Sequence, residues 1–280
     1  MRAPLHVDQI ALDTQWRYSH PFPPLGFVPF ADGALGNGDT FGLYWPIGRE
    51  REEPLVAETW HDEWRVQPTY SSLERFLLAW GRRDEDDLPE PLTLEEDPAS
   101  PRTCLERARE RVSAGDLEGA CALLERAVAV LPEFTDALSA LWSVYVRTRR
   151  PELAAPVAIR AIISPRCFGL RAVKPLRWLR SADVPAPLRA DPIWKRREGL
   201  SLEFGGAKHN EDYPLLLGAI EEYLDQSQYE PALTLMQTYA EFMASETTAF
   251  QERCQFNREA FLQRQIEVSA KLPGGARNVF

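Results

Sequence analysis

Residues 36–48 read GNGDTFGLYWPIG and decide the fold expected for the first part of the chain. The glycines and asparagine at 36–38 favour the positive φ angles of a tight turn between two strands. Residues 40–45 are rich in aromatic and β-branched side chains, which predicts a β-strand. Pro46 cannot donate to a strand ladder and ends this strand. A tight turn leading into an aromatic strand is therefore the starting point of the fold.

The segments that follow predict two more strands and a helix. Residues 55–60 read LVAETW and are expected to pair with the first strand, and residues 64–66 form a shorter third strand. A helix is expected to begin at Ser71, where Glu74 completes a capping box three positions later. Its inward stripe consists of Phe76, Leu77 and Trp80. We expect a small curved sheet backed by this helix.

The run from about residue 30 to residue 80 resembles the SUKH (Smi/Knr-like) superfamily. The resemblance rests on the Gly-Asn-Gly-Asp turn at 36–39, the aromatic strand after it, the approach to Ser71 and the Phe-Leu pair of the helix. It implies an α+β domain with a small mixed sheet. Bacterial members are largely immunity proteins, which bind and neutralise secreted toxins. Such a protein works by binding, so the resemblance implies no enzymatic activity.

The second part of the chain has a helical pattern that repeats after 34 residues. Around a turn at Gly115 and Asp116, small or apolar residues recur at that interval. The matching positions are Ala120 and Ala154, Leu124 and Ala158, and Ala127 and Ala161. This spacing resembles the tetratricopeptide repeat, a pair of antiparallel helices whose small residues allow close approach. Two copies are expected, at about 99–132 and 133–166.

Further helices are expected toward the C-terminus. Residues 213–242 predict a third helical pair with its turn at 228–232, and residues 246–271 predict a final polar helix that caps the array. The stretch 165–210 contains several prolines and basic residues and predicts either short helices or a long connector.

A domain boundary is expected near residue 98. The stretch 81–101 is charged and punctuated by prolines, so it can bury little apolar surface and is interpreted as a linker. The expected domains are residues 1–98, a SUKH-like α+β domain ending in this acidic linker, and residues 99–280, an all-α tetratricopeptide-like domain. A chain of 280 residues is long enough for two such domains.

The composition favours a cytoplasmic protein that needs no metal or cofactor. The sequence has no apolar run of about 18 residues that could cross a bilayer, and its first residues lack the pattern of a signal peptide. The four cysteines are widely spaced and are expected to be reduced and mostly buried. They are Cys104, Cys121, Cys167 and Cys254.

The net charge of −10 is unevenly distributed. Residues 1–98 contain 8 arginines, no lysine and 19 acidic residues, whereas residues 99–280 are nearly neutral. Within the second part, residues 160–208 carry a charge of +7 and residues 209–280 a charge of −6. An acidic first domain repels nucleic acid and attracts a basic protein partner. The same charge is also consistent with a surface that only keeps the protein soluble.

His61, Asp62 and Glu63 form the most tempting catalytic group, because they place an imidazole beside two carboxylates. Adjacent residues in a turn point in different directions, so we interpret them as structural or partner-contacting residues rather than a catalytic or metal site. The glycines and lysine of residues 205–208 lack the spacing of a phosphate loop.

The basic tract 171–197 includes Trp178 and Trp194. It could contact RNA by phosphate pairing and stacking. Arginines on helix surfaces beside core tryptophans would give the same pattern, as would a segment that docks on the acidic first domain. The overall acidity favours the helix-surface interpretation.

The leading functional hypothesis is an immunity protein that masks the active surface of a cognate toxin, such as a basic, nuclease-like one, in the cytoplasm. Neither nucleic acid nor a membrane is expected as a partner. Neighbouring residues of a strand face opposite sides, so one of Tyr44 and Trp45 is expected in the core and the other on the surface. Exposed aromatic residues rimmed by carboxylates are good anchors for a protein. The candidate partner-binding residues are Asp39, Trp45, Asp62, Glu63 and Trp64.

The alternative hypothesis is an adaptor or regulatory scaffold, as in the fungal cell-wall regulators of the resembling superfamily, that binds a cellular protein through its helical repeats. An enzyme that uses His61 with Asp62 and Glu63 is a third class, for which the sequence offers no supporting constellation.

Overall fold

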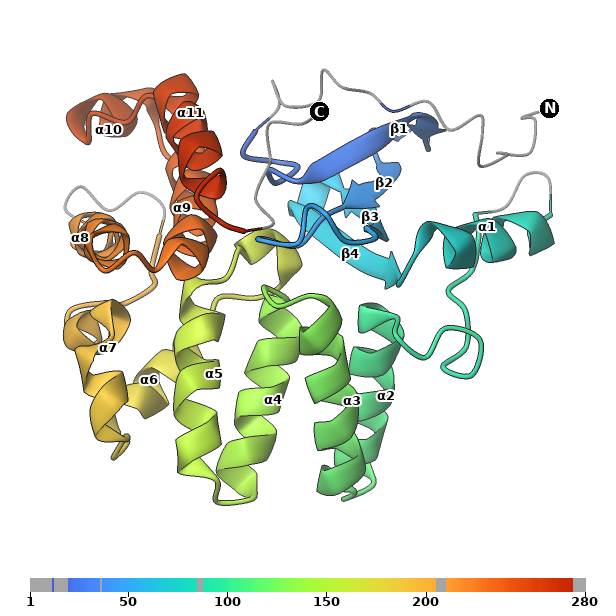
Figure 1. Cartoon of the computed structure of the whole chain (residues 1–280), viewed down its shortest axis with the longest axis horizontal. Helices are drawn as coiled ribbons and strands as arrows, with labels where there is room; N and C mark the ends of the chain where they lie inside the picture. The colour runs from blue at the N-terminus through green and yellow to red at the C-terminus, as the bar shows by residue number, and fades with distance from the viewer. Residues whose placement is uncertain (1–11, 13–19, 36, 85–87, 205–209, 274–280) are drawn as a thin grey trace. The chain divides into compact units, whose positions relative to one another are not determined.

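The computed structural model describes residue 12 and residues 20–35, 37–84, 88–204 and 210–273. The chain divides into two compact units, the first ending at Pro132 and the second beginning at Glu133. Figure 1 labels the helices and strands, which together make an α+β protein. Each unit is described separately below.

The first unit is built on a four-stranded antiparallel sheet in the order β1-β2-β3-β4. Its strands are β1 (Phe27–Ala34), β2 (Thr40–Tyr44), β3 (Leu55–Trp60) and β4 (Arg65–Tyr70). In the register, Leu43 lies opposite Val28 on β1 and Val56 on β3. The strands expected at 40–45 and 55–60 are confirmed, and the short third strand extends through Tyr70. The sheet is antiparallel throughout, whereas the resemblance implied a mixed one.

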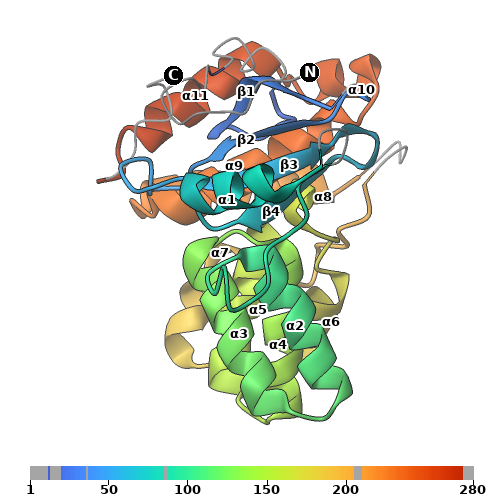
Figure 2. The ribbon, with the colours of Figure 1, turned by 90° about the vertical axis from the view of Figure 1, so that its right-hand side faces the viewer.

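Helix α1 (Leu73–Arg82) covers one face of this sheet, as Figure 2 shows. Phe76 is fully buried, and its ring lies within 5.1–5.5 Å of the rings of Phe30, Phe41 and Tyr70. Trp80 is also buried, whereas Leu77 is only partly so. The aromatic residues of the helix and of the strands therefore form one core.

The capping box expected at Ser71 and Glu74 is wrong by one residue. Ser72 is the N-cap of α1, and its hydroxyl accepts from the backbone N–H of Arg75 at 3.3 Å. Ser71 instead donates its backbone N–H and its hydroxyl to the two oxygens of Asp97, at 2.9 and 2.6 Å. The preceding serine is thus used in a long-range contact that a local pattern cannot show.

The segment expected to be a linker is anchored at four buried positions, which are Pro89, Leu92, Asp97 and Ser100. The Tyr70 hydroxyl donates to the carbonyl oxygen of Pro89 at 3.0 Å, and the Thr103 hydroxyl donates to that of Leu92 at 3.3 Å. Asp97 is fully buried, and the Ser100 hydroxyl donates to the Thr69 carbonyl at 2.7 Å. The centre of the acidic cluster, residues 85–87, lies outside the described residues.

These contacts attach helix α2 (Pro101–Ser113) to β4. Helix α3 (Leu117–Val130) packs against α2, and the Arg126 guanidinium donates to the Pro98 carbonyl at 3.0 Å. Both helices therefore belong to the compact unit of the sheet. The division between the units lies after Pro132, whereas the sequence placed a boundary near residue 98.

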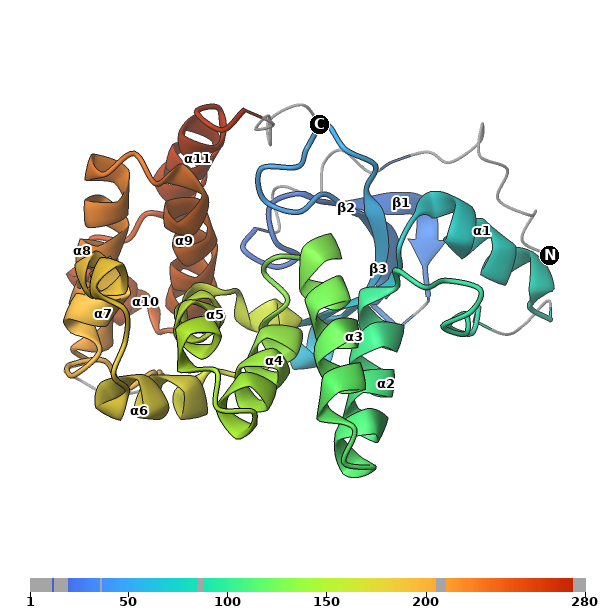
Figure 3. The same ribbon diagram turned by 60° about the horizontal axis from the view of Figure 1, so that its bottom comes forward.

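The second unit begins with helices α4 (Thr135–Arg147) and α5 (Pro151–Ile163), which pack against each other. Helices α2 and α4 begin 34 residues apart, at Pro101 and Thr135, and α3 and α5 begin 34 residues apart, at Leu117 and Pro151. Figure 3 shows α2 beside α3, and α4 beside α5. The repeated small residues are buried: Ala120, Leu124, Ala127, Ala154, Ala158 and Ala161 are each at most 1% exposed. The two predicted helical pairs are therefore present.

Residues 164–204 form short helices rather than an extended connector. They comprise the 3-10 helices η4 (Arg166–Phe168) and η5 (Ala186–Ala190) and the α-helices α6 (Val173–Ser181) and α7 (Pro192–Arg196). The third helical pair is confirmed as α8 (Asp212–Asp225) and α9 (Tyr229–Ala244). Helix α9 is buried without interruption from residue 232 to residue 243 and is the central helix of this unit.

The single final helix expected at 246–271 is instead two helices, α10 (Thr248–Arg253) and α11 (Arg258–Ser269). Gln255 has a φ angle of 53°, which ends the first helix in a left-handed turn. The Asn257 side chain then caps the second by accepting from the Ala260 N–H at 2.8 Å. Helix α11 packs against α9 in Figure 1.

The cysteines are free thiols, as expected, and three of the four are buried. Over the described ranges of the chain, no helix has both the length and the apolarity to cross a membrane.

Candidate functional site at the His61 turn

The predicted site residues around His61 lie where the loop between β1 and β2 meets the turn between β3 and β4. That turn is a 3-10 helix, η3 (His61–Glu63). The loop is closed by a hydrogen bond from the Leu35 N–H to the Asp39 carbonyl at 2.9 Å, and the Thr40 N–H donates to the Thr59 hydroxyl at 2.9 Å. These bonds bring Asp39 beside His61, although the two residues are far apart in sequence.

Gly38 is required for this approach. Its φ angle is +97°, and a Cβ atom added there would lie 2.7 Å from Cε1 of the His61 ring. Any L-residue at this position would be strained and would also push the imidazole away. The glycine therefore serves both the turn and the contact between the two loops.

The His61 imidazole lies between two carboxylates. Its Nδ1 is 2.9 Å from Oδ1 of Asp39, and its Nε2 is 3.1 Å from Oδ1 of Asp62. The backbone N–H of His61 also donates to Asp39, at 2.7 Å. Asn37 completes the cluster, because its side-chain amide donates to Oδ2 of Asp39 at 2.8 Å. The Asp39 carboxylate is thus held on both oxygens.

Asp39 and His61 shift each other's pKa values. Burial opposes ionisation of Asp39, but the hydrogen bonds from His61 and Asn37 outweigh it and lower the pKa of this carboxyl. The hydrogen bond with Asp39, followed by the charge of Asp62, raises the pKa of the His61 imidazole. The cluster therefore favours a charged ring between charged carboxylates.

The next residues of the turn face outward. The Asp62 side chain is 91% exposed, and Glu63 is also exposed. Trp64 adopts a left-handed conformation at φ 52° and ψ 45°, and its ring stacks on that of Phe22 at a centroid distance of 5.5 Å. Two exposed carboxylates on this turn are therefore followed by a half-buried tryptophan that stacks on Phe22.

Trp45, the fifth predicted site residue, does not belong to this surface. Its side chain is 8% exposed, and that of Tyr44 is 1% exposed. The expectation that one of the two is exposed is wrong. Trp45 follows the last residue of β2, and its N–H donates to the Gly26 carbonyl at 3.0 Å, which ties it to the chain before β1 rather than to the solvent. Asp39, Asp62, Glu63 and Trp64 remain as the residues that the structure brings together.

The described residues contain no group of three or more histidine, cysteine or acidic side chains arranged to hold a metal ion. The glycine-rich segment at 205–208 lies outside the described residues.

The basic tract of the second unit is largely used to fasten its own loops. Arg180 donates to the carbonyl oxygens of Arg197 and Leu200, and Arg171 donates to that of Leu202 at 3.0 Å. Lys195 and Arg196 both pair with Glu222. This arrangement supports the interpretation of these residues as helix-surface cations rather than a nucleic-acid site.

The two tryptophans of this tract are packed as well. Trp194 is buried, with the Arg197 guanidinium 3.6 Å from the centre of its ring. Trp178 contacts Trp142 of α4 edge-on, at a centroid distance of 6.1 Å. The Trp194 ring is therefore not a free platform on which a base could stack, and the Trp178 ring is half-buried.

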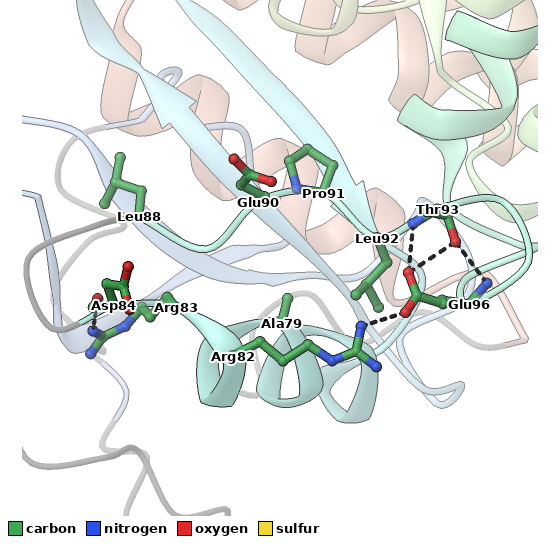
Figure 4. Close-up of a pocket in the computed structure, with 10 residues that line it drawn as sticks. All are labelled: Ala79, Arg82, Arg83, Asp84, Leu88, Glu90, Pro91, Leu92, Thr93 and Glu96. Atoms are coloured by element: carbon green, nitrogen blue, oxygen red, sulfur yellow. Dashed lines mark hydrogen bonds and ion pairs between the residues drawn. The ribbon is translucent and has the colours of Figure 1, made fainter.

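A cavity of about 570 Å³ lies between the end of α1 and the segment 88–96 (Figure 4). Arg82 on its wall pairs with Glu96, which also accepts from the N–H and hydroxyl of Thr93 at 3.1 and 2.9 Å. The hydrogen bonds from Arg82 and Thr93 lower the pKa of Glu96 to about 2. The charges of this wall are directed at one another, and we assign the cavity no ligand.

The sequence analysis missed the buried polar clusters of the second unit, including the one around Glu241. Glu241 on α9 is fully buried and accepts from the Gln237 amide at 3.1 Å and from the Cys167 N–H at 3.2 Å. Burial raises the pKa of Glu241 to about 7 despite these hydrogen bonds. The signal in the sequence is a glutamine and a glutamate four positions apart on a helix whose other buried residues are apolar or threonine.

The fold and the site define an α+β protein in which a small antiparallel sheet is combined with helical pairs and carries an exposed acidic turn. The chain belongs to the YfbP family. Residues 12–89 match the YfbP N-terminal domain and residues 203–278 match the YfbP C-terminal domain. It is 40% identical over 263 residues to the uncharacterized protein YfbP of Escherichia coli (strain K12), an alignment that covers 93% of each chain. The resemblances to the SUKH superfamily and to tetratricopeptide repeats stay predictions.

Proposed function

We propose that this protein is not an enzyme but binds another protein through the His61 turn and masks its working surface, as an immunity protein neutralises a toxin. The observation that carries the proposal is the exposure of Asp62 and Glu63 on a turn that Asp39 fixes in place. Fixed charges bind a partner with less loss of conformational entropy than mobile ones do. The partner expected from this charge is a basic protein.

Two further features support a protein partner. The Phe22–Trp64 pair lies beside the carboxylates, and aromatic residues next to charged groups are typical binding anchors. The first 98 residues contain 19 acidic residues and 8 arginines, so the net charge of this part of the chain favours the approach of a basic protein and opposes nucleic acid.

The test is coexpression with the product of the adjacent upstream gene, scored both by rescue of growth and by formation of a complex. If a complex forms, Asp62→Lys is expected to weaken it at least tenfold at low salt and to flatten its salt dependence. The matched control is Glu118→Lys, which makes the same charge change on an exposed position of α3. Equal affinity of the wild type and Asp62→Lys would show that the turn is not the binding surface.

The second candidate function is a non-enzymatic adaptor that binds a cellular protein through its helices. The 34-residue interval between the helical pairs α2–α3 and α4–α5 favours it, because proteins built from repeated helical pairs commonly bind partners through their helices. In the second unit, Leu170 is 76% exposed and Leu153 is 40% exposed, and both precede or begin helices of the array.

The two functions are separated by the partner and by the variants that weaken its binding. The adaptor would be favoured if the protein, expressed at its natural level, copurifies with a regulatory protein. Binding of that partner should then be weakened by Leu170→Asp but not by Asp62→Lys. The reverse pattern, together with rescue from a toxin, would favour the immunity protein.

A further inference from the structure

His61 makes more contacts than a neutral imidazole can support. Both ring nitrogens lie within hydrogen-bond distance of a carboxylate oxygen, at 2.9 Å for Asp39 and 3.1 Å for Asp62. A carboxylate can only accept, so each contact needs a proton on the nitrogen, and a neutral ring carries only one. The arrangement in the structure is therefore that of the imidazolium.

The two carboxylates are not held equally. Asp39 also accepts from the His61 backbone at 2.7 Å and from Asn37 at 2.8 Å, so it stays in place without the second ring proton. Among the described residues, the Asp62 carboxylate has no hydrogen bond or ion pair apart from the one with His61. Loss of one proton from the ring is expected to leave the bond to Asp39 and break the one to Asp62.

We propose that His61 is a proton-controlled latch on Asp62: the charged ring holds this carboxylate against the turn, and the neutral ring releases it to a basic partner. The inference rests on the proposed function for the identity of the surface, and it adds how that surface is regulated. With the latch closed, the charge of Asp62 is offset by the imidazolium. With the latch open, the turn carries one more uncompensated negative charge.

The surroundings of the ring determine the direction of the switch. The charged groups that act on His61 are Asp39 from the β1–β2 loop and Asp62 from η3, and both favour the charged ring. Glu58 on β3 is the further carboxyl that interacts with Asp39. Since these groups are all acidic, the latch opens only at a pH above that at which an isolated imidazole loses its proton. Affinity for a cation therefore rises with pH.

The test follows the His61 Cε1–H resonance of the full-length protein by NMR between pH 5 and 9, with the signal assigned from His61→Gln. We expect His61 to titrate at a lower pH in Asp62→Asn than in the wild type, and lower still in Asp39→Asn. The matched control is Glu63→Gln, which alters the adjacent exposed carboxylate and should leave the titration unchanged. A titration that is the same in the wild type and in Asp62→Asn would overturn the latch.

A second measurement asks whether release changes binding. A deca-lysine peptide serves as the cationic probe, and its affinity for the wild type is expected to rise roughly two- to fivefold across the His61 titration, the size of one exposed charge pair. Asp62→Asn should make this step smaller and move it to the lower pH at which His61 titrates in that variant, because the ring still loses its own charge. An affinity with the same pH dependence in both proteins would refute the release of Asp62.

The latch and the proposed function fail in different ways. If His61 responds to Asp62→Asn but coexpression yields no complex, the latch stands and the function in binding a toxin fails. If a complex forms through the turn while His61 titrates at the same pH in the wild type and in Asp62→Asn, the function stands and the latch is wrong.

Discussion

At the scale of single residues, a few positions are determined by two physical requirements at once. Gly38 is one, because its positive φ angle coincides with the position at which the His61 ring rests. Glu241 is another, because its full burial raises the pKa of the carboxyl while two hydrogen bonds favour the charged form. Each position gives a prediction.

Replacing Gly38 by alanine is expected to destabilise the protein by about 1–2 kcal/mol, since an L-residue is strained in this region of φ. The added Cβ also meets the His61 ring, so the resonances of His61 should shift. Urea unfolding measures the loss. Gly81→Ala is the control, because Gly81 is helical and nothing lies within 4 Å of its added Cβ. That variant should gain about 0.5–1 kcal/mol, and equal losses in the two variants would contradict the explanation.

Replacing Glu241 by glutamine is expected to stabilise the protein above neutral pH. The folded-state pKa of about 7 exceeds the ordinary value of 4.5, so the folded protein holds its proton longer than the unfolded chain does. The free energy of unfolding of the wild type therefore falls as pH rises from 4.5 through about 7, by about 3 kcal/mol at most. Glutamine cannot ionise, so its advantage over the wild type should be absent near pH 4.5 and complete by pH 8.

Chemical unfolding at several pH values measures this difference, with Glu259→Gln as the exposed control on α11. A difference between Glu241→Gln and the wild type that does not change with pH would mean that Glu241 titrates normally in the folded protein.

At the scale of elements, the sequence predicts what depends on neighbours along the chain. The strand at 55–60 agrees with β3 residue for residue, and the 34-residue interval reappears in the starts of the helices. Alternation, turn glycines and helical periodicity are local signals, so they survive in a single sequence. The position of Asp39 beside His61 could not be predicted, because it depends on how two separate loops are closed.

The segment from residue 88 to residue 100 shows the limit of such reasoning. Its prolines and charges are typical of a linker. Yet Tyr70 of β4 and Thr103 of α2 donate hydrogen bonds to its carbonyl groups, and Ser71 donates to Asp97. These partners lie 11 to 26 positions away in the sequence. Composition describes how much apolar surface a segment can bury, but it does not reveal which distant polar groups it satisfies.

This view of the segment predicts that Asp97→Ala is costly although Asp97 lies in an acidic, proline-rich stretch. Both hydrogen bonds to Ser71 would be lost and the Ser71 N–H left without its acceptor, which is expected to cost roughly 2–3 kcal/mol. Thermal unfolding gives the loss, and limited proteolysis should find cleavage between α1 and α2. Glu95→Ala, at an exposed position of the same segment, should be neutral. A tolerant Asp97→Ala variant would restore the linker interpretation.

At the scale of the whole molecule, the question is where the first folding unit ends. The match to the YfbP N-terminal domain stops at residue 89 and the sequence pattern suggested a boundary near 98, whereas the compact unit continues to Pro132. The contacts that decide the matter are hydrogen bonds: Ser100 to Thr69, Arg126 to Pro98, and Arg49 of the sheet unit to Ala129 near the end of α3.

If these contacts define the unit, a fragment of residues 1–132 should unfold cooperatively, and a fragment of residues 1–98 should not. The shorter fragment loses α2, which packs against the edge strand β4, and leaves the Thr69 and Pro98 carbonyls without their donors. Circular dichroism during urea unfolding distinguishes the two. Ser100→Ala in the longer fragment removes both the N-cap of α2 and its bond to Thr69, so it should weaken the transition by about 1–2 kcal/mol. Cooperative unfolding of residues 1–98 with unchanged stability would instead place the boundary where the prolines are, because the sheet and α1 would then need no support from α2 and α3.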